Sequence, residues 1–261
     1  MIILDTQILS HCFKDTEARV PAPTTAISSI TANEFLLAQP REDGRPDYYV
    51  LHPAKFGYLM KTDPGYFVPD DIGNPKWAQR GVRRTDQVVI DFGNQFPPYR
   101  EFGNEAISEI INANLIDLYK ISVAHLTKEK QKYLKRRLRY IVDHRYYCYP
   151  LNVLTIETGL NLFSRFVEKY SCKNSVRNTV NDILILATAI ERQLPLLTQD
   201  NLLSRFAADQ YDAVIKSDAD AIVVDFSCAE TNKRKNSRES KGYTNRGWSY
   251  SVRNNRSVKG T

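Results

Sequence analysis

Four acidic residues lie at points of the sequence where strands and helices are expected to meet. Asp5 and Asp200 each follow a short apolar run, Asp182 opens a long apolar segment, and Glu34 follows a β-prone stretch. Carboxylates that gather in one place repel one another and destabilise a fold unless cations are present. Mg²⁺ and Mn²⁺ prefer carboxylate and water oxygens as ligands, so these four acids predict a divalent-metal site.

Hydrolysis of a phosphodiester is the chemistry that such a site can perform. Mg²⁺ held by few protein ligands keeps several waters and takes phosphate oxygens from a substrate. It can activate a water and stabilise the leaving oxygen of an in-line displacement. The other metal-ligating residue types suggest no second site, because the four histidines show no ligand spacing and the four cysteines form no CxxC pair.

Alternating strands and helices must position these acids. Such alternation is typical of an α/β fold with a mainly parallel sheet. We also expect Thr31 or Asn33 to cap the helix that carries Glu34. The predicted strands are residues 2–4, 24–30, 87–92, 195–198 and 221–226, and the main predicted helices are residues 127–144, 155–170, 182–193 and 201–208.

A parallel sheet would bring the acids to one edge. Ligands bind beyond the carboxyl ends of the strands in such sheets, and Asp5 and Asp200 both follow predicted strands. Asp182 is predicted to begin the helix that leads into the second of these strands. Glu34 is predicted near the start of the helix that follows residues 26–30. All four side chains are therefore expected at the same edge.

Each acid also has a purely structural explanation. Asp5 is then an ordinary strand-end residue, and Asp182 is a helix N-cap or first-turn acid beside the helix dipole. Asp200 caps the helix at residues 201–208, and Glu34 lies on a solvated helix face. Convergence of all four on one edge favours a site over four separate structural roles.

The segments MIILDTQIL, SSITANEFLL, NDILILATAI and LPLLTQD resemble the four-motif series of PIN-domain nucleases, and most closely the VapC-like toxin ribonucleases. The resemblance implies a three-layer α/β/α sandwich with a mainly parallel central sheet and an acidic Mg²⁺ or Mn²⁺ site that hydrolyses RNA. It also implies a neutralising antitoxin or other protein partner, and a homodimer. The positions that match the catalytic and metal-binding acids are Asp5, Glu34, Asp182 and Asp200, and the supporting hydroxyls, which would orient a ligand or water, are those of Thr6 and Thr198.

The resemblance covers only part of the chain. It spans residues 1–38 and 150–228, which we interpret as the two parts of a PIN-like core. Residues 39–149 have no counterpart in the family and are interpreted as a largely irregular and helical insertion. Residues 229–261 form a basic tail. The resemblance therefore concerns the cleavage chemistry and says little about the choice of target.

Basic residues gather in two places outside the acidic motifs. Residues 230–261 hold nine Lys or Arg and two Glu, in a chain whose net charge is +6. Residues 128–145 hold eight Lys or Arg with tyrosines interleaved, which suits a phosphate backbone and stacked bases. The alternative is a solvated helix face whose tyrosines pack inward. The predicted nucleic-acid contacts are Lys135, Arg136, Arg137 and Arg139.

The aromatic residues of the tail leave several roles open. Tyr243, Trp248 and Tyr250 would stack on RNA, dock onto a partner or dock onto the body of the protein. The remaining alternative is a tail that only raises solubility, since its composition is typical of disordered segments.

The sequence as a whole predicts a metal-dependent endoribonuclease that acts on RNA, as a toxin or as a stress or defence effector. The alternatives are a structure-specific DNA nuclease and a non-catalytic nucleic-acid-binding subunit. Scattered cysteines indicate thiols in a reducing compartment, which predicts a cytoplasmic protein. No apolar run approaches the roughly 18–20 residues of a membrane span, so no membrane association is expected.

Overall fold

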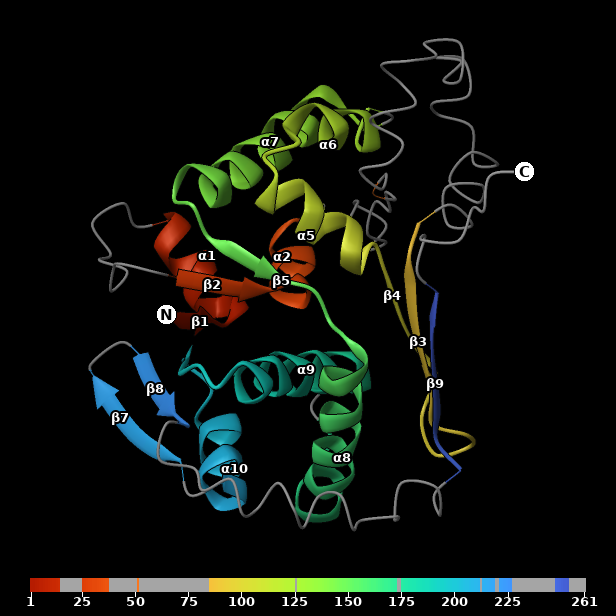
Figure 1. Ribbon diagram of the computed structural model, residues 1–261, viewed down its shortest axis with the longest axis vertical. Helices are drawn as coiled ribbons and strands as arrows, with labels where there is room; N and C mark the ends of the chain where they lie inside the picture. The colour runs from red at the N-terminus through yellow and green to blue at the C-terminus, as the bar shows by residue number, and fades with distance from the viewer. Residues whose placement is uncertain are drawn as a thin grey trace.

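The computed structural model gives a mixed α/β protein with helices on both sides of a central sheet (Figure 1). Eight helices and nine strands lie in the part of the chain that the structure describes. The described residues are 1–14, 25–37, 51, 85–124, 126–172, 175–211, 213–218, 221–226 and 247–253.

The central sheet has six strands in the order β5-β2-β1-β6-β8-β7. The neighbours β5, β2, β1 and β6 are all parallel, whereas β8 runs antiparallel to β6 and to β7. This arrangement confirms the predicted mainly parallel sheet. The strands are β1 (Ile2–Leu4), β2 (Thr25–Ser28), β5 (Tyr147–Tyr149), β6 (Leu196–Thr198), β7 (Val214–Asp218) and β8 (Ala221–Asp225).

Alternating side chains of the central strands divide the core into two layers. Ile3 and Leu196 face one hydrophobic cluster, and their neighbours Leu4 and Leu197 face the other, as the two-residue period of a strand requires. The first layer contains α8 (Val153–Lys169), α9 (Val176–Arg192) and α10 (Asn201–Tyr211). The second contains α1 (Thr6–Lys14), α2 (Ser29–Phe35), α5 (Asn104–Asn112), α6 (Ile116–Ser122) and α7 (Lys128–Asp143). Helices on both faces are compatible with an α/β/α sandwich.

The predicted starts of two helices are wrong, and each of these helices carries an acid of the site. Helix α9 begins at Val176 rather than at Asp182, because Thr179 and Val180 already continue its buried face. Asp182 is therefore inside the helix and is neither its N-cap nor in its first turn.

Helix α2 begins earlier than predicted, after Ser28. The Ser28 hydroxyl accepts a hydrogen bond from the Thr31 amide at 3.0 Å, so neither Thr31 nor Asn33 is the cap. Glu34 consequently lies in the last turn of a seven-residue helix and not near its start. The predicted basic helix is confirmed as α7, with Thr127 as its N-cap and Leu134, Leu138 and Ile141 buried.

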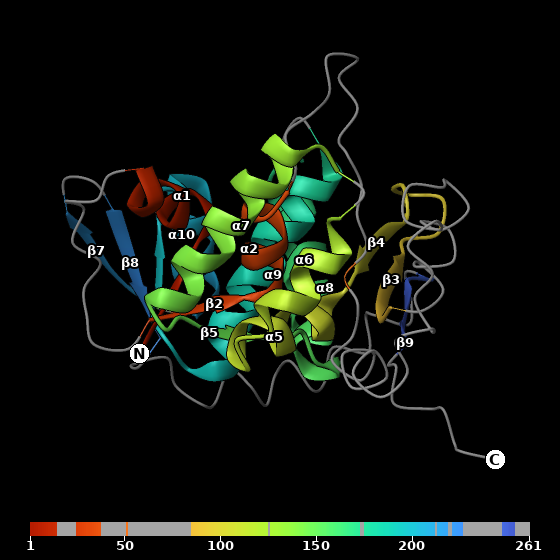
Figure 2. The same ribbon diagram turned by 90° about the horizontal axis from the view of Figure 1, so that it is seen from above.

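A second sheet pairs two strands of the predicted insertion with one strand of the basic tail. It is antiparallel, in the order β4-β3-β9, and lies at the opposite end of the molecule from β7 and β8 (Figure 2). Its strands are β3 (Gln87–Asp91), which confirms the predicted strand, β4 (Tyr99–Phe102) and β9 (Ser249–Arg253). Strand β9 comes from the basic tail, so this part of the tail is ordered against the body.

Trp248 fixes the tail to the body. Its side chain is only 4% exposed, and its ring lies 5.2 Å from Phe92 and 5.7 Å from Phe163. Its indole N–H donates to Gln95 Oε1 at 3.1 Å. Among the roles considered for the tail aromatics, docking onto the body is the one that Trp248 performs. Tyr243 lies outside the described residues.

The described part of the predicted insertion belongs to the core of the molecule. Strand β5 is an edge strand of the central sheet, and helices α5, α6 and α7 pack within its second layer. The boundaries at residues 38, 149 and 228 stay a prediction. Among the described residues, no helix is both long and apolar enough to cross a membrane. Cys12, Cys148 and Cys172 are free thiols, and Cys228 lies outside the described residues.

Removal of the Trp248 side chain should destabilise the fold. We expect Trp248→Ala to lower the free energy of unfolding by about 3–5 kcal/mol, because it empties a packed aromatic cluster. Urea unfolding followed by circular dichroism measures this loss. Tyr250→Phe is the control, since it removes one hydrogen bond to Glu157 and should cost about 1 kcal/mol or less. A loss for Trp248→Ala no larger than that for Tyr250→Phe would contradict the expected contribution of Trp248 packing.

Candidate active site

Asp5 is the buried centre of the candidate site. It follows β1, and its side chain is held from two directions. Oδ1 accepts from the Thr6 amide at 2.6 Å, and Oδ2 accepts from the Thr198 hydroxyl at 2.6 Å. The residue is only 3% exposed. Because β1 and β6 are parallel neighbours, the residues that follow them, Asp5 and the Thr198–Asp200 turn, meet at one edge of the sheet, as predicted.

Asp200 has a structural role at this edge. Its Oδ1 accepts from the amides of Leu202 and Leu203 at 2.9 and 3.0 Å, so it caps helix α10. Its own amide donates to the Thr198 hydroxyl at 3.0 Å. Thr198 therefore links Asp5 and Asp200 through a single hydroxyl. The capping explanation is correct for Asp200, and it also fixes the direction in which the carboxylate points.

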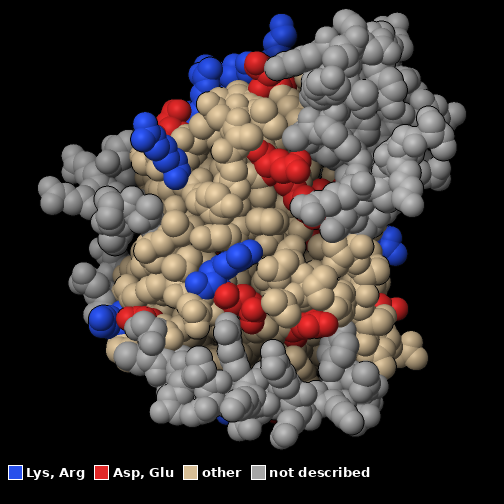
Figure 3. Space-filling view, in the orientation of Figure 1, with Lys and Arg blue, Asp and Glu red and all other residues tan. Residues whose placement is uncertain are grey.

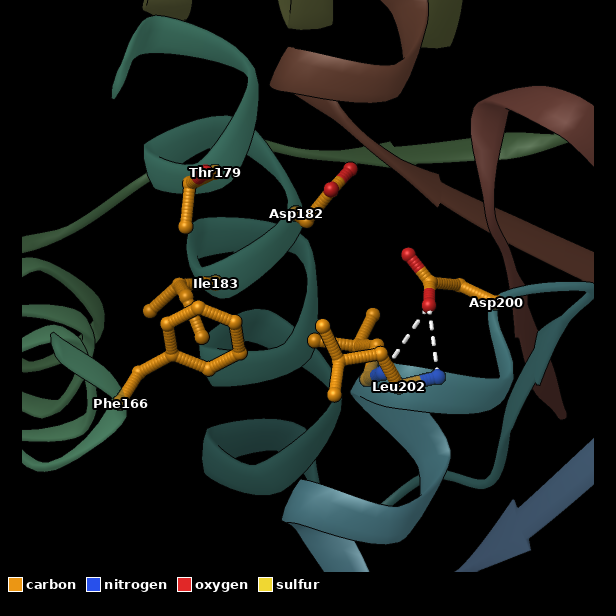
Figure 4. Close-up of a pocket in the computed structure, with 7 residues that line it drawn as sticks. Phe166, Thr179, Asp182, Ile183, Asp200 and Leu202 are labelled. Carbon is orange, nitrogen blue, oxygen red and sulfur yellow. Dashed lines mark hydrogen bonds between the residues drawn. The ribbon is translucent and has the colours of Figure 1, made fainter. Parts of the chain in front are cut away.

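Asp182 and Asp200 point into the same space from opposite sides (Figure 4). Asp182 projects from α9 and Asp200 from the turn between β6 and α10. Both residues are partly exposed, and a small apolar recess with no room for a water molecule lies beside them. The recess is lined by Phe166, Thr179, Asp182, Ile183, Asp200, Leu202 and Leu203.

Glu34 is tied to the same site through two hydrogen bonds. Its Oε2 accepts from the Thr6 hydroxyl at 2.6 Å, and its Oε1 accepts from Asn181 Nδ2 at 2.6 Å. Thr6 is the residue after Asp5, and Asn181 is the residue before Asp182. Glu34 is thus bonded to the immediate sequence neighbours of two other acids, and it does not lie on a solvated helix face.

The four carboxylates act on one another electrostatically. Burial raises the pKa of Asp5, and the charges of Glu34 and Asp200 raise it further, against hydrogen bonds from Thr198 and Thr6 that lower it. Burial likewise raises the pKa of Glu34, and the charge of Asp182 adds to that rise. These couplings connect Asp200, Asp5, Glu34 and Asp182 in one continuous series. Ionisation of the group is therefore unfavourable without a nearby cation.

The donor atoms of the site suit Mg²⁺ or Mn²⁺. Carboxylate oxygens with neighbouring hydroxyl and amide oxygens are the ligands that these ions prefer. Among the described residues, no group of three or more His, Cys, Asp or Glu lies close enough to hold an ion as a complete cage. Mg²⁺ commonly needs only one or two carboxylates, with waters and substrate phosphate completing its shell. Asp182 and Asp200 are the two partly exposed carboxylates that face one another here (Figure 4).

Sequence reasoning missed a polar network that supports Glu34. The Tyr99 hydroxyl donates to Asn181 Oδ1 at 2.8 Å, which fixes the amide that donates to Glu34. Glu101, 5% exposed, pairs with Arg177 Nη2 at 2.6 Å and accepts from the Tyr99 hydroxyl at 3.3 Å. Tyr99 and Glu101 come from β4 in the predicted insertion. No motif or period in the sequence relates β4 to α9, so only the structure identifies these contacts.

The predicted nucleic-acid contacts do not line the recess between Asp182 and Asp200. Lys135, Arg136 and Arg139 line a separate groove between α1 and α7. Arg137 points inward, where it donates to the Phe35 carbonyl and lies 4.6 Å above the rings of Phe35 and Tyr133. Burial lowers the pKa of Arg137.

The tyrosines of this region also divide into side chains that pack inward and one that is exposed. Tyr146 is buried, and Tyr133 and Tyr140 are half-buried against neighbouring side chains, whereas Tyr147 is exposed. Inward packing is therefore correct for most of them.

Comparisons with known proteins add no further support. No protein-family model matches the sequence, and no curated protein or solved structure gives a significant match. The interpretation of the site consequently depends on its own geometry and on the sequence motifs that led to it.

Neutralising Glu34 should stabilise the protein at neutral pH. The folded-state pKa of Glu34 lies above its ordinary value of 4.5, so wild-type stability falls as pH rises from 4.5 through that raised pKa. Glu34→Gln has no charge to bury, and we expect it to be more stable than wild type above this window and to lose the advantage below pH 4.5. Urea unfolding in EDTA across this pH range measures the difference.

An exposed glutamate provides the control for this pH effect. Glu157→Gln also alters a carboxylate that accepts from a hydroxyl, that of Tyr250, but Glu157 is exposed. It should change stability little at any pH. A Glu34→Gln variant that is less stable than wild type at neutral pH would contradict the unfavourable ionisation of the site.

Removing the Arg177 charge should destabilise the network through Glu101. We expect Arg177→Met to lower the free energy of unfolding by about 1–3 kcal/mol, because it leaves a buried carboxylate without its cation and the arginine itself is half exposed. In a Glu101→Gln background, where no buried charge needs the arginine, Arg177→Met should lower the free energy of unfolding by much less than it does in wild type. Strict additivity of the two substitutions, measured by urea unfolding, would show that the pair is not coupled.

Proposed function

We propose that this protein is a metal-dependent endoribonuclease that hydrolyses RNA phosphodiester bonds with Mg²⁺ or Mn²⁺. The observation that carries the proposal is the hydrogen-bonded linkage of four acids at one edge of the sheet. Thr198 bonds both Asp5 and the Asp200 amide, and Glu34 accepts from Thr6 and from Asn181, the neighbour of Asp182. The resemblance of their four motifs to PIN-domain nucleases, and to the VapC-like toxins in particular, supports the same chemistry. The mixed α/β fold with helices on both sides of a mainly parallel sheet is compatible with a PIN-like sandwich.

The residues of the chain have distinct tasks in this proposal. Asp182 and Asp200 would hold the ion, since both are partly exposed and their carboxylates face the same space (Figure 4). Bound there, Mg²⁺ or Mn²⁺ supplies a water of lowered pKa and charge stabilisation for the leaving oxygen. Asp5 and Glu34 complete the negative charge that attracts the ion. Thr198 and Thr6 orient those two carboxylates directly, which extends the role expected of their hydroxyls.

The biological setting follows from the resemblance alone. We propose a toxin or a stress or defence effector that acts in the cytoplasm. A neutralising protein partner would cover the acidic edge of the sheet, as an antitoxin does, and would contribute a basic side chain to it. Two copies of the chain would associate as a homodimer.

One observation favours a second function, a non-catalytic nucleic-acid-binding subunit. The groove between α1 and α7, lined by Lys135, Arg136 and Arg139, needs no metal to bind phosphate, and the described residues include no group of three acids placed as a ready metal cage. Such a protein would bind RNA with a steep salt dependence and leave it uncut.

A single cleavage assay separates these functions. Labelled single-stranded RNA, single-stranded DNA and branched DNA are incubated with the protein in Mg²⁺, Mn²⁺ or EDTA. The proposal expects internal cleavage of RNA that EDTA abolishes. Cleavage confined to branched DNA would indicate a structure-specific DNA nuclease, and binding without any cleavage would indicate the non-catalytic subunit.

Neutralising Asp182 should abolish most of the activity while the fold stays intact. We expect Asp182→Asn to lower the rate of RNA cleavage by about 10²–10³-fold, the usual effect of removing one charge-stabilising group from an active site. Asp209→Asn is the matched control, because Asp209 is an exposed acid on α10 outside the recess. Circular dichroism checks the fold of both variants. Unchanged cleavage by Asp182→Asn would refute the assigned site.

A further inference from the structure

A groove between α1 and α7 gathers positive charge at a distance from the acids. We define the basic groove by its cations, Lys14 of α1 and Lys132, Lys135, Arg136 and Arg139 of α7. Lysine and arginine side chains gather over the same layer of the molecule, at the top of Figure 3. Asp143 is the one acid that lines the groove together with them.

Among the described residues, other cations pair with acids, but the five groove cations do not. Lys120 pairs with Asp117, Lys169 with Asp209 and Arg177 with Glu101. Within the described residues, no carboxylate forms an ion pair with any of the five groove cations. Five like charges that face one groove repel one another, and a polyanion would remove that repulsion.

The spacing of the α7 cations matches an extended row of phosphates. Residues 132, 135, 136 and 139 lie three and four apart, so they occupy one face of the helix, opposite the buried row Leu134, Leu138 and Ile141. From residue 132 to residue 139 the helix rises about 10 Å, which spans about three stacked nucleotides of a strand.

Aromatic rings in the groove favour a single strand with accessible bases. Phe13 lies beneath Arg136 at 5.1 Å, and Tyr140 and His144 contact each other with ring centroids 4.1 Å apart. Phe13 and Tyr140 are half-buried, and His144 is exposed. Phe13 and Tyr140 pack against neighbouring side chains and support the exposed His144 ring, on which an unpaired base can stack. A duplex hides its bases from such a ring, and an acidic protein segment gains little from it.

We propose that the basic groove binds the phosphate backbone of single-stranded RNA. This inference rests on the proposed function and names a second contact region for its substrate. Helix α1 connects the two regions, since Thr6 lies beside Asp5 at one end and Lys14 lies in the groove at the other, about 12 Å away. The groove holds a strand on its way to the acids and takes no part in the hydrolysis itself.

Two matched double variants test the groove. Lys132→Gln with Lys135→Gln removes two groove lysines, and Lys128→Gln with Lys130→Gln removes two lysines of the same helix that do not line the groove. Both are made in the Asp182→Asn background and measured in EDTA. Fluorescence anisotropy then reports binding of a labelled single-stranded RNA over a series of salt concentrations, without cleavage.

The groove pair should weaken binding about tenfold at low salt and reduce the slope of log affinity against log salt by about 1.4, which corresponds to two lost phosphate contacts. The control pair should change affinity by about twofold or less. Equal effects of the two pairs, or tighter binding of polyglutamate than of RNA, would overturn the proposal.

A protein whose binding depends on the groove but which never cuts RNA refutes only the nuclease function. If the protein cleaves RNA but its RNA affinity is not changed by the groove pair, only this inference is refuted.

Discussion

The site depends on a carboxylate that is buried where an apolar side chain would be more stable. Asp5 is almost fully enclosed, and two hydrogen bonds, from Thr6 and Thr198, offset part of its desolvation. The same Thr198 hydroxyl accepts a hydrogen bond from the Asp200 amide, and the Thr6 hydroxyl donates one to Glu34. Each neighbouring acid is therefore positioned by a residue that also holds Asp5. A carboxylate kept at this energetic cost is typical of functional sites, where perturbed pKa values concentrate.

Parallel pairing of β1 with β6 is what makes this arrangement possible. Ile3 is level with Leu196 and Leu4 with Leu197, so the two strands end together and their following residues meet. The Asp5 amide donates to the Leu197 carbonyl at 2.9 Å, which continues the pairing to the acid itself. A shift of one residue in this register would turn each core side chain to the wrong face. The hydrophobic pattern of the strands therefore also fixes the position of the acids.

The sequence predicted the features that follow from periodicity and strand order, and failed where side chains decided the outcome. Apolar spacing predicted five of the nine described strands (β1, β2, β3, β6 and β8), the mainly parallel sheet and the amphipathic face of α7. It missed β4, β5, β7 and β9. The start of α9 was misplaced because Asp182 resembled a helix-initiating acid, although the apolar face extends back to Thr179. The network of Tyr99, Glu101 and Arg177 could not be predicted from the sequence, because polar contacts between distant elements follow no periodic pattern.

Strand β9 gives the order of synthesis a role in the assembly of the site. An isolated hairpin of β3 and β4 is marginally stable, and its third strand and the Trp248 ring arrive only with the last part of the chain. Strand β4 supplies Tyr99, whose hydroxyl holds the Asn181 amide against Glu34. A ribosome-bound chain that ends before Trp248 already contains all four acids but lacks the support for this contact. The last strand of the described chain therefore helps to stabilise the sheet that supplies this contact.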